Sequence, residues 1–207
     1  MFRAVVTGPE DVRVVDASVE LSRRDDGIRV VALGWIANGS DRALEDLEVV
    51  VSLFDDQGRL VDSLHHRGLE SVAPGERTPF RIVEPRPEAT RSWTRHEAVV
   101  VRGRKAGGGS AQPITEREEM RIREEEGAPV EVVAVGLVRN EGQSDQIRHL
   151  RIGFFDAEGQ LLDVVSESDG PPIGPGKSRG YQASAELLWP SERYARATVV
   201  GWNASGW

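Results

Sequence analysis

The sequence predicts an all-β protein made of two tandem antiparallel β-sandwich domains. Two observations lead to this prediction. Short segments with the composition of strands are separated by turn signals, and three blocks of sequence occur twice in the same order. The 207 residues are enough for two domains of about 100 residues each. A hydrophobic content of 39% and a charged content of 29% are typical of a globular chain.

The repeated blocks lie about 101 residues apart. Residues 30–38 read VVALGWIAN and residues 132–140 read VVAVGLVRN, while FDDQGRL from Phe54 corresponds to FDAEGQL from Phe155. A Pro-Gly pair follows in each copy, with its glycine 21 residues after that phenylalanine. This period is too long for one unit of a solenoid, so the sequence predicts two separate domains.

The predicted domains are residues 1–103 and 115–207, joined by a linker of residues 104–114. The linker contains three consecutive glycines together with Ser, Ala and Pro, which is typical of a flexible connection. We therefore expect each copy to form its own sandwich, with no sheet that continues across the linker.

Residues 47–54, LEVVVSLF, and residues 150–154, LRIGF, have the β-branched composition and the alternation of strands. Successive side chains on a strand point to opposite faces, so each of these strands presents one apolar face. Those faces carry Val49, Val51 and Leu53 in the first copy and Leu150, Ile152 and Phe154 in the second. We expect them to line the two cores.

An aspartate follows each of these strands and begins a predicted hairpin turn. Asp55 stands three residues before Gly58, and Asp156 three before Gly159, the ends that Asp and Gly favour in a type I turn. We prefer this structural role to a catalytic one, because hydrogen bonding to backbone N–H groups explains both aspartates.

Residues 115–126, TEREEMRIREEE, have a high helix propensity and a capping box. Their apolar residues Met120 and Ile122 are nevertheless two positions apart, which is the spacing of a strand. We therefore predict a strand here and not a helix.

These blocks resemble a known family. The strand ends VSLFD and IGFFD (residues 51–55 and 152–156) are similar to the FxLYD motif, which names a family of bacterial immunoglobulin-like domains. The family's G-x-v-x-N element matches residues 34–38 and 136–140, and its P-G-E-x-x-x-F element matches residues 74–80 and, more loosely, 175–181. The resemblance implies immunoglobulin-like sandwiches, often found outside the cytoplasm, and it brings no catalytic residues.

The stretch GPPIGPGKS, residues 170–178, ends like a phosphate-binding loop. Such a loop needs a glycine five residues before Gly176, where this chain has Pro171. The other copy has Glu76 in the position of Lys177, and a phosphate site would not tolerate that change of charge. We predict a type II turn here and no nucleotide.

Metal and catalytic motifs are missing from the sequence. It has no cysteine, and its four histidines (His65, His66, His96 and His149) form no zinc motif, so we expect no metal and no cofactor. Three acidic runs, at 25–26, 55–56 and 124–126, could offer oxygen ligands to calcium, but none has an EF-hand pattern. We prefer a solvated surface for them.

The net charge of −8, with no basic patch, disfavours nucleic-acid binding. No apolar run is long enough to span a membrane, and the start MFRAVVTGPED has no signal-peptide pattern. Together with the missing site chemistry, these features predict a protein that is not an enzyme.

One strand in each copy is apolar on both faces and carries the candidate interaction surface. If Gly34 and Ile36 face the core, a second apolar face remains, formed by Val31, Leu33 and Trp35 in the first copy and Val133, Val135 and Leu137 in the second. This face is either covered by the domain's own loops or used for contact between domains or chains. For the second case we expect burial against the other domain or in a two-fold homodimer.

The leading functional hypothesis is a non-catalytic tandem immunoglobulin-like protein that binds a protein partner, extracytoplasmic by the family resemblance. The alternative is a module that binds a small ligand or a carbohydrate through exposed tryptophans, which would be Trp93, Trp189, Trp202 or Trp207.

Overall fold

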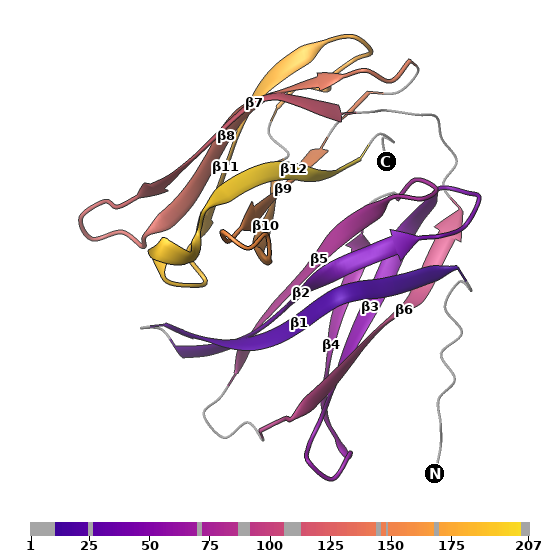
Figure 1. Cartoon of the computed structure of the whole chain (residues 1–207), viewed down its shortest axis with the longest axis vertical. Helices are drawn as coiled ribbons and strands as arrows, with labels where there is room; N and C mark the ends of the chain where they lie inside the picture. Colours follow the sequence, from indigo (N-terminus) through magenta and orange to yellow (C-terminus); the bar gives the residue numbers. More distant parts are fainter. Residues whose placement is uncertain are drawn as a thin grey trace. The chain divides into compact units, whose positions relative to one another are not determined.

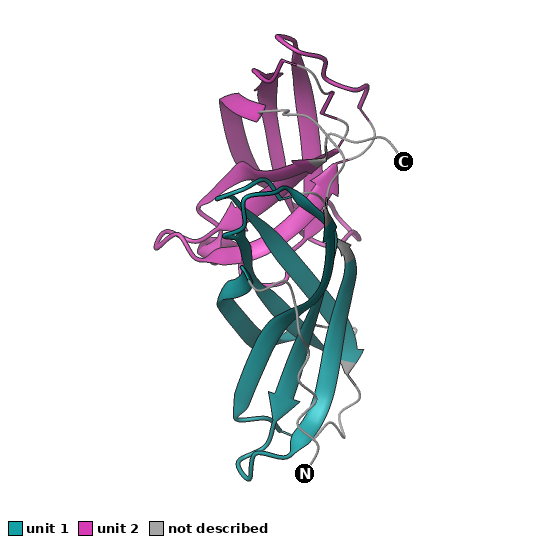
Figure 2. Cartoon of the chain, turned by 90° about the vertical axis from the view of Figure 1, so that its right-hand side faces the viewer, with its two compact units in different colours: residues 1–106 teal, residues 107–207 magenta. Residues whose placement is uncertain are grey.

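A computed structural model describes residues 11–24, 27–69, 72–86, 92–105, 113–143, 146–147, 149–167 and 170–203. In this part of the chain the structure is all-β, as predicted, with twelve strands and no α-helix (Figure 1). The strands form four antiparallel sheets of three strands each. The chain divides into two compact units, unit 1 (Met1–Ala106) and unit 2 (Gly107–Trp207), which Figure 2 colours separately.

Unit 1 contains six strands in two sheets. The strands are β1 (Val12–Arg24), β2 (Gly27–Asn38), β3 (Leu44–Phe54), β4 (Leu60–Leu69), β5 (Arg77–Arg86) and β6 (Arg95–Lys105). One sheet has the order β1-β2-β5 and the other the order β4-β3-β6, so β2 and β3 are the central strands.

Unit 2 repeats this arrangement strand for strand. Its strands are β7 (Pro113–Arg123), β8 (Glu131–Asn140), β9 (His149–Phe155), β10 (Leu161–Glu167), β11 (Ser178–Glu186) and β12 (Arg196–Asn203), with a single 3-10 turn at Ser191–Arg193. The sheets have the orders β11-β8-β7 and β10-β9-β12, so β8 and β9 take the central places of β2 and β3.

Each unit encloses its own apolar core between its two sheets. The six side chains predicted to line the cores are fully buried in them: Val49, Val51 and Leu53 in unit 1, and Leu150, Ile152 and Phe154 in unit 2. The opposing sheets contribute Val30, Ala32 and Ile36, or Val132, Ala134 and Val138. The predicted core faces are therefore confirmed.

The segment at 115–126 is a strand, as predicted, up to Arg123. Met120 and Ile122 pack against the core of unit 2, while Arg121 between them is exposed. Strand β6 continues to Lys105 and β7 begins at Pro113, so the predicted linker overlaps strands at both ends. Its middle, residues 106–112, lies outside the described residues, and no sheet of the described chain joins the units.

Candidate interaction surface

Each repeated glycine, Gly34 or Gly136, packs directly against an aromatic ring of the neighbouring strand. Gly34 of β2 pairs with Phe80 of β5, and Gly136 of β8 pairs with Tyr181 of β11. A Cβ atom on either glycine would approach the ring to 2.6 Å. The glycine of one repeated block thus makes room for the aromatic residue of another, which accounts for both residues without any site chemistry.

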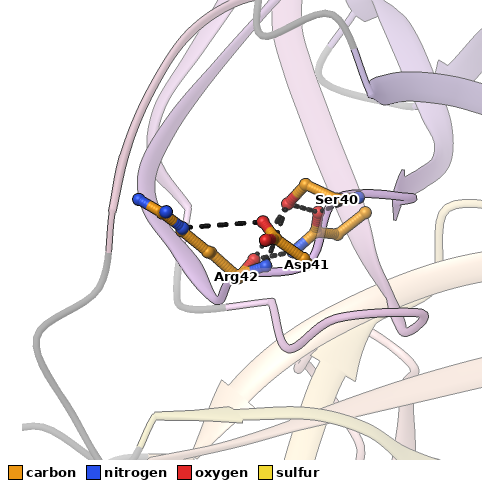
Figure 3. Close-up of polar contacts among 4 residues, drawn as sticks. Ser40, Asp41 and Arg42 are labelled. Atoms are coloured by element: carbon orange, nitrogen blue, oxygen red, sulfur yellow. Dashed lines mark hydrogen bonds and ion pairs between the residues drawn. The ribbon is translucent and has the colours of Figure 1, made fainter.

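The repeated asparagines join three segments at the end of a central strand. Asn38 is buried, and its Nδ2 donates to the carbonyl oxygens of Arg42 (2.7 Å) and Val72 (2.9 Å). Its Oδ1 accepts from the N–H of Ser40 at 3.0 Å. Figure 3 shows Ser40 and Arg42 in this network, beside the exposed ion pair of Arg42 with Asp41.

Asn140 makes equivalent contacts in unit 2. Its Nδ2 donates to the carbonyl oxygen of Ile173 at 3.0 Å, and its Oδ1 accepts from the N–H of Gly142 at 2.9 Å. Backbone bonds complete the junction, because Gly176 donates to the carbonyl oxygen of Asn140. The asparagine therefore fixes the Pro-Gly turn against the end of β8.

Replacing Asn140 by alanine should destabilise unit 2 by about 1–3 kcal/mol, since it removes the partners of buried backbone groups. Urea unfolding checks this, and Asn38→Ala should have an effect of similar size on unit 1. A loss below about 0.5 kcal/mol for both variants, the range of ordinary surface substitutions, would contradict the structural role.

The stretch GPPIGPGKS is a turn, as predicted. Lys177 donates its N–H to the carbonyl oxygen of Gly174 at 3.1 Å, and Gly176 has φ of 68°, as position i+2 of a type II turn requires. In unit 1, Glu76 and Gly75 repeat this geometry, with φ of 75° at the glycine.

The repeated aspartates also have the predicted role. The Oδ1 of Asp55 accepts from the N–H groups of Gln57 and Arg59, both at 2.9 Å, in the hairpin between β3 and β4. The Oδ1 of Asp156 accepts from the N–H of Gln160 at 2.7 Å in the hairpin between β9 and β10. The backbone hydrogen bonds to Asp55, together with the hydrogen bond from the side chain of Arg59, hold the pKa of Asp55 below its ordinary value.

A further repeated pair was missed in the sequence. The guanidinium of Arg95 lies 4.3 Å from the ring centre of Phe54, and that of Arg196 lies 4.2 Å from that of Phe155. In each pair the arginine lies opposite the phenylalanine on the neighbouring strand. The two arginines are 101 residues apart from each other, as are the two phenylalanines. Extending the repeat alignment to the last strand of each unit would have found them.

Unit 2 also has a carboxylate between its two sheets. Tyr181 donates its hydroxyl to the Oε1 of Glu118 at 2.8 Å. Burial raises the pKa of Glu118, although hydrogen bonds from Tyr181, Thr198 and the backbone of Val199 oppose this rise. Burial next to this carboxylate likewise raises the pKa of Tyr181.

Replacing Glu118 by glutamine should make the stability of unit 2 less dependent on pH. A carboxyl whose pKa is raised by folding is protonated more readily in the folded chain, so its contribution to stability is present at acidic pH and is lost as pH rises through the folded pKa. Relative to wild type, Glu118→Gln should therefore become more stable as pH rises from about 4 to about 7. Urea unfolding across this range measures it, with the exposed neighbour Glu119→Gln as control; identical slopes for the two variants would contradict it.

The histidines form no metal site in the described structure. No group of three or more potential metal ligands occurs among the described residues. The Nε2 of His96 lies 3.2 Å from the carbonyl oxygen of Ala17, and the Nδ1 of His65 lies 3.7 Å from the Oε1 of Glu48. His96 thus contacts a backbone carbonyl and His65 a single carboxylate.

Three of the tryptophans named for ligand binding are described, and they are partly buried. Trp93 packs against the core of unit 1, and Trp189 and Trp202 pack against the core of unit 2, all three partly buried. The Nε1 of Trp189 donates to the carbonyl oxygen of Leu162 at 3.0 Å. The prediction that these three rings are exposed was wrong, because an indole buries a large apolar area when it packs against a core. Trp207 lies outside the described residues.

In unit 1 the predicted surface residues lie together on the outer face of β2, and they are buried. Val31, Leu33 and Trp35 are 1%, 3% and 9% exposed and are not part of the core between the sheets. The guanidinium of Arg77 lies over the indole of Trp35, 4.4 Å from the ring centre, and Pro79 pairs with Trp35 on the neighbouring strand.

In unit 2 the exposure of the equivalent residues increases along β8, from Val133 to Leu137. Val133 is fully buried, Val135 is partly buried and Leu137 is 37% exposed. Leu137 takes the position of Trp35, but its neighbour on β11 is Gly180, which has no side chain to cover it. Ile114 of β7, which is 40% exposed, pairs with Arg139 on the same face, two residues from Leu137. Leu137 and Ile114 are the exposed large apolar side chains in the described part of unit 2, and we call them the apolar patch.

Charged and polar side chains lie on the same sheet face as this apolar patch. Arg117, Glu119 and Arg121 of β7 flank β8 on one side, and Gln182 and Ser184 of β11 flank it on the other, all of them exposed. An apolar centre with a polar rim is the usual composition of a protein-binding surface.

No family model matches the sequence, and no curated protein matches it. Among solved structures, the chain is similar to red sea bream transglutaminase, with 9% identity and a TM-score of 0.27. The match covers 84% of this chain and 27% of that chain, so this chain spans about a quarter of that protein's length. A likeness this weak carries no argument about activity.

Proposed function

We propose that this chain is a non-catalytic binding protein made of two tandem immunoglobulin-like domains, and that the apolar patch of unit 2 binds a protein partner. The observation that carries this proposal is the exposure of Leu137 and Ile114 on one sheet face, because Trp35, at the position of unit 1 equivalent to Leu137, is buried. Burying such a patch in a complex is favourable by about 25 cal/mol for each Å² of apolar area.

Two further observations support binding in place of catalysis. The repeated asparagines and aspartates described above have structural roles, so a catalytic role is not needed to explain them. Of the tryptophans that a ligand-binding module would expose, Trp93, Trp189 and Trp202 pack against the cores. We extend the proposal to a location outside the cytoplasm, on the resemblance to FxLYD domains. No helix in the described part of the chain has the length and apolarity needed to cross a membrane.

The test compares Leu137→Glu with wild type in capture of partners from an envelope extract of the source cells. The matched control is Val99→Glu, because Val99 is 43% exposed on a sheet of unit 1. We expect wild type and the control to recover the same protein and Leu137→Glu to lose it, with all three chains unfolding at similar urea concentrations. Equal recovery by Leu137→Glu would contradict the proposal.

A further inference from the structure

The edge strands of the four sheets differ in how they are protected against pairing with another chain. Eight of the twelve strands lie at a sheet edge, where unpaired backbone groups can extend the sheet. Six of them have a register shift against their neighbour, which disrupts a regular edge. These six are β1, β4, β6, β7, β10 and β12. The two regular edge strands are β5 and β11, which take equivalent places in the two units.

Prolines block the regular edge of unit 1. Along an antiparallel strand, alternate residues direct their N–H and C=O groups to the neighbour and away from it. The N–H of Asn38 donates to the carbonyl oxygen of Glu76, so the alternation directs Pro79 and Pro85 of β5 away from β2. A proline has no N–H to offer an added strand, and prolines at edges are a common means of preventing strand addition.

The equivalent edge of unit 2 has no such block. The N–H of Asn140 donates to the carbonyl oxygen of Lys177, so the same alternation directs Ser178, Gly180, Gln182 and Ser184 outward. Gly180 replaces Pro79 and Glu186 replaces Pro85 in the 101-residue alignment. Strand β11 keeps a continuous register with β8 over all nine of its residues, and its outward-directed residues have mostly small, uncharged side chains.

We propose that β11 pairs with β11 of a second copy of this chain, antiparallel and centred on Gln182, to form a two-fold dimer with one continuous six-stranded sheet. In this register Gly180 faces Ser184, Ser178 faces Glu186 and Arg179 faces Ala185, so no like charges face each other. Gly180, Gln182 and Ser184 each donate and accept a backbone hydrogen bond across the two-fold axis.

The opposite edge of the same sheet limits the assembly to two copies. Strand β7 has a register shift between Thr115 and Arg117 and a dense set of exposed charged side chains, so it is a poor template for a further strand. The dimer uses backbone groups at the edge of the sheet, whereas the proposed partner binds Leu137 and Ile114 on its face, although the side chains of Gln182 and Ser184 lie beside both surfaces. Either inference can fail while the other holds.

A single cysteine provides the first test, because the natural chain has none. In the proposed dimer Gln182 faces its own counterpart, with Cα atoms about 5.5 Å apart, a separation that a disulfide spans. Under mild oxidation Gln182→Cys should become a covalent dimer. The matched control is Arg81→Cys, at the equivalent position of the proline-blocked β5, which should form no covalent dimer.

Charge substitution at the same position tests the register without oxidation. Gln182→Lys and Gln182→Glu should each raise the dimer dissociation constant about tenfold or more, and an equal mixture of the two should restore dimerisation. Sedimentation velocity measures this, and Gln182 is exposed, so each variant should unfold as wild type does. A wild-type chain that is monomeric at all concentrations would overturn the proposal. So would equal cross-linking of both cysteine variants, or charge variants that dimerise as wild type does.

Discussion

Unit 2 is expected to lose about 3–5 kcal/mol of its unfolding free energy when Phe154 is replaced by alanine. Phe154 is fully buried between the two sheets, and its ring meets that of Tyr194 edge-on, with centroids 6.3 Å apart. The substitution leaves a cavity that close-packed strands cannot fill, so the lost contacts are not replaced.

Urea unfolding followed by tryptophan fluorescence measures this loss, since Trp189 and Trp202 report on unit 2. Leu137→Ala is the control in the same unit, and it should change stability by less than about 0.5 kcal/mol because its side chain is partly in water. A Phe154→Ala effect as small as that of the control would show that the core is not where the structure places it.

Replacing Gly136 by alanine should destabilise unit 2 by up to about 3 kcal/mol, although it adds one methyl group. The new Cβ would lie 2.6 Å from the backbone oxygen of Arg117 and 2.6 Å from the ring of Tyr181. The ring can turn away, but the backbone oxygen belongs to a paired strand and moves only with it. Urea unfolding of the variant measures the effect.

Gly180→Ala is the matched control, since the nearest atom to its new Cβ is 3.7 Å away, an ordinary contact. It should leave unit 2 unchanged within about 0.5 kcal/mol. In unit 1 the closest obstacle to Gly34→Ala is the side chain of Phe80, so Phe80→Leu should relieve part of that cost. Equal stability of Gly136→Ala and Gly180→Ala would contradict the close approach of Tyr181.

The sequence was sufficient to predict the strands, the turns and the core faces because these depend on local patterns that occur twice. The alternation that placed Ile152 and Phe154 in the core follows from the period of a strand, and the turn at Gly176 follows from the need for positive φ. A repeat strengthens each inference, because a structural role must fit both copies, as it does for Asp55 and Asp156.

The exposure of the outer faces could not be predicted in this way. Trp35 and Leu137 occupy equivalent places, yet Trp35 is 9% and Leu137 is 37% exposed. Their neighbours across the sheet, Pro79 and Gly180, lie more than 40 residues away in sequence, so a pattern along one strand could not predict the difference. The same is true of the apolar residue Leu21, which is 43% exposed on the edge strand β1. Exposure depends on neighbours brought by the sheet, which periodicity along one strand does not specify.

The residues common to both units account for the fold, so the proposed function rests on the surface differences between the units. Leu137 and Gly180 of unit 2 replace Trp35 and Pro79 of unit 1, so that one buried position of the outer face becomes exposed and one proline is lost from the edge strand. The central claim is therefore that unit 2 carries the binding surface.

The most direct test of this claim is partner capture by the two halves, prepared as residues 1–106 and 107–207. Each half should first unfold cooperatively in urea, since each encloses its own core. The account predicts that residues 107–207 recover the protein captured by the whole chain and that residues 1–106 do not. Recovery by residues 1–106 alone would contradict it.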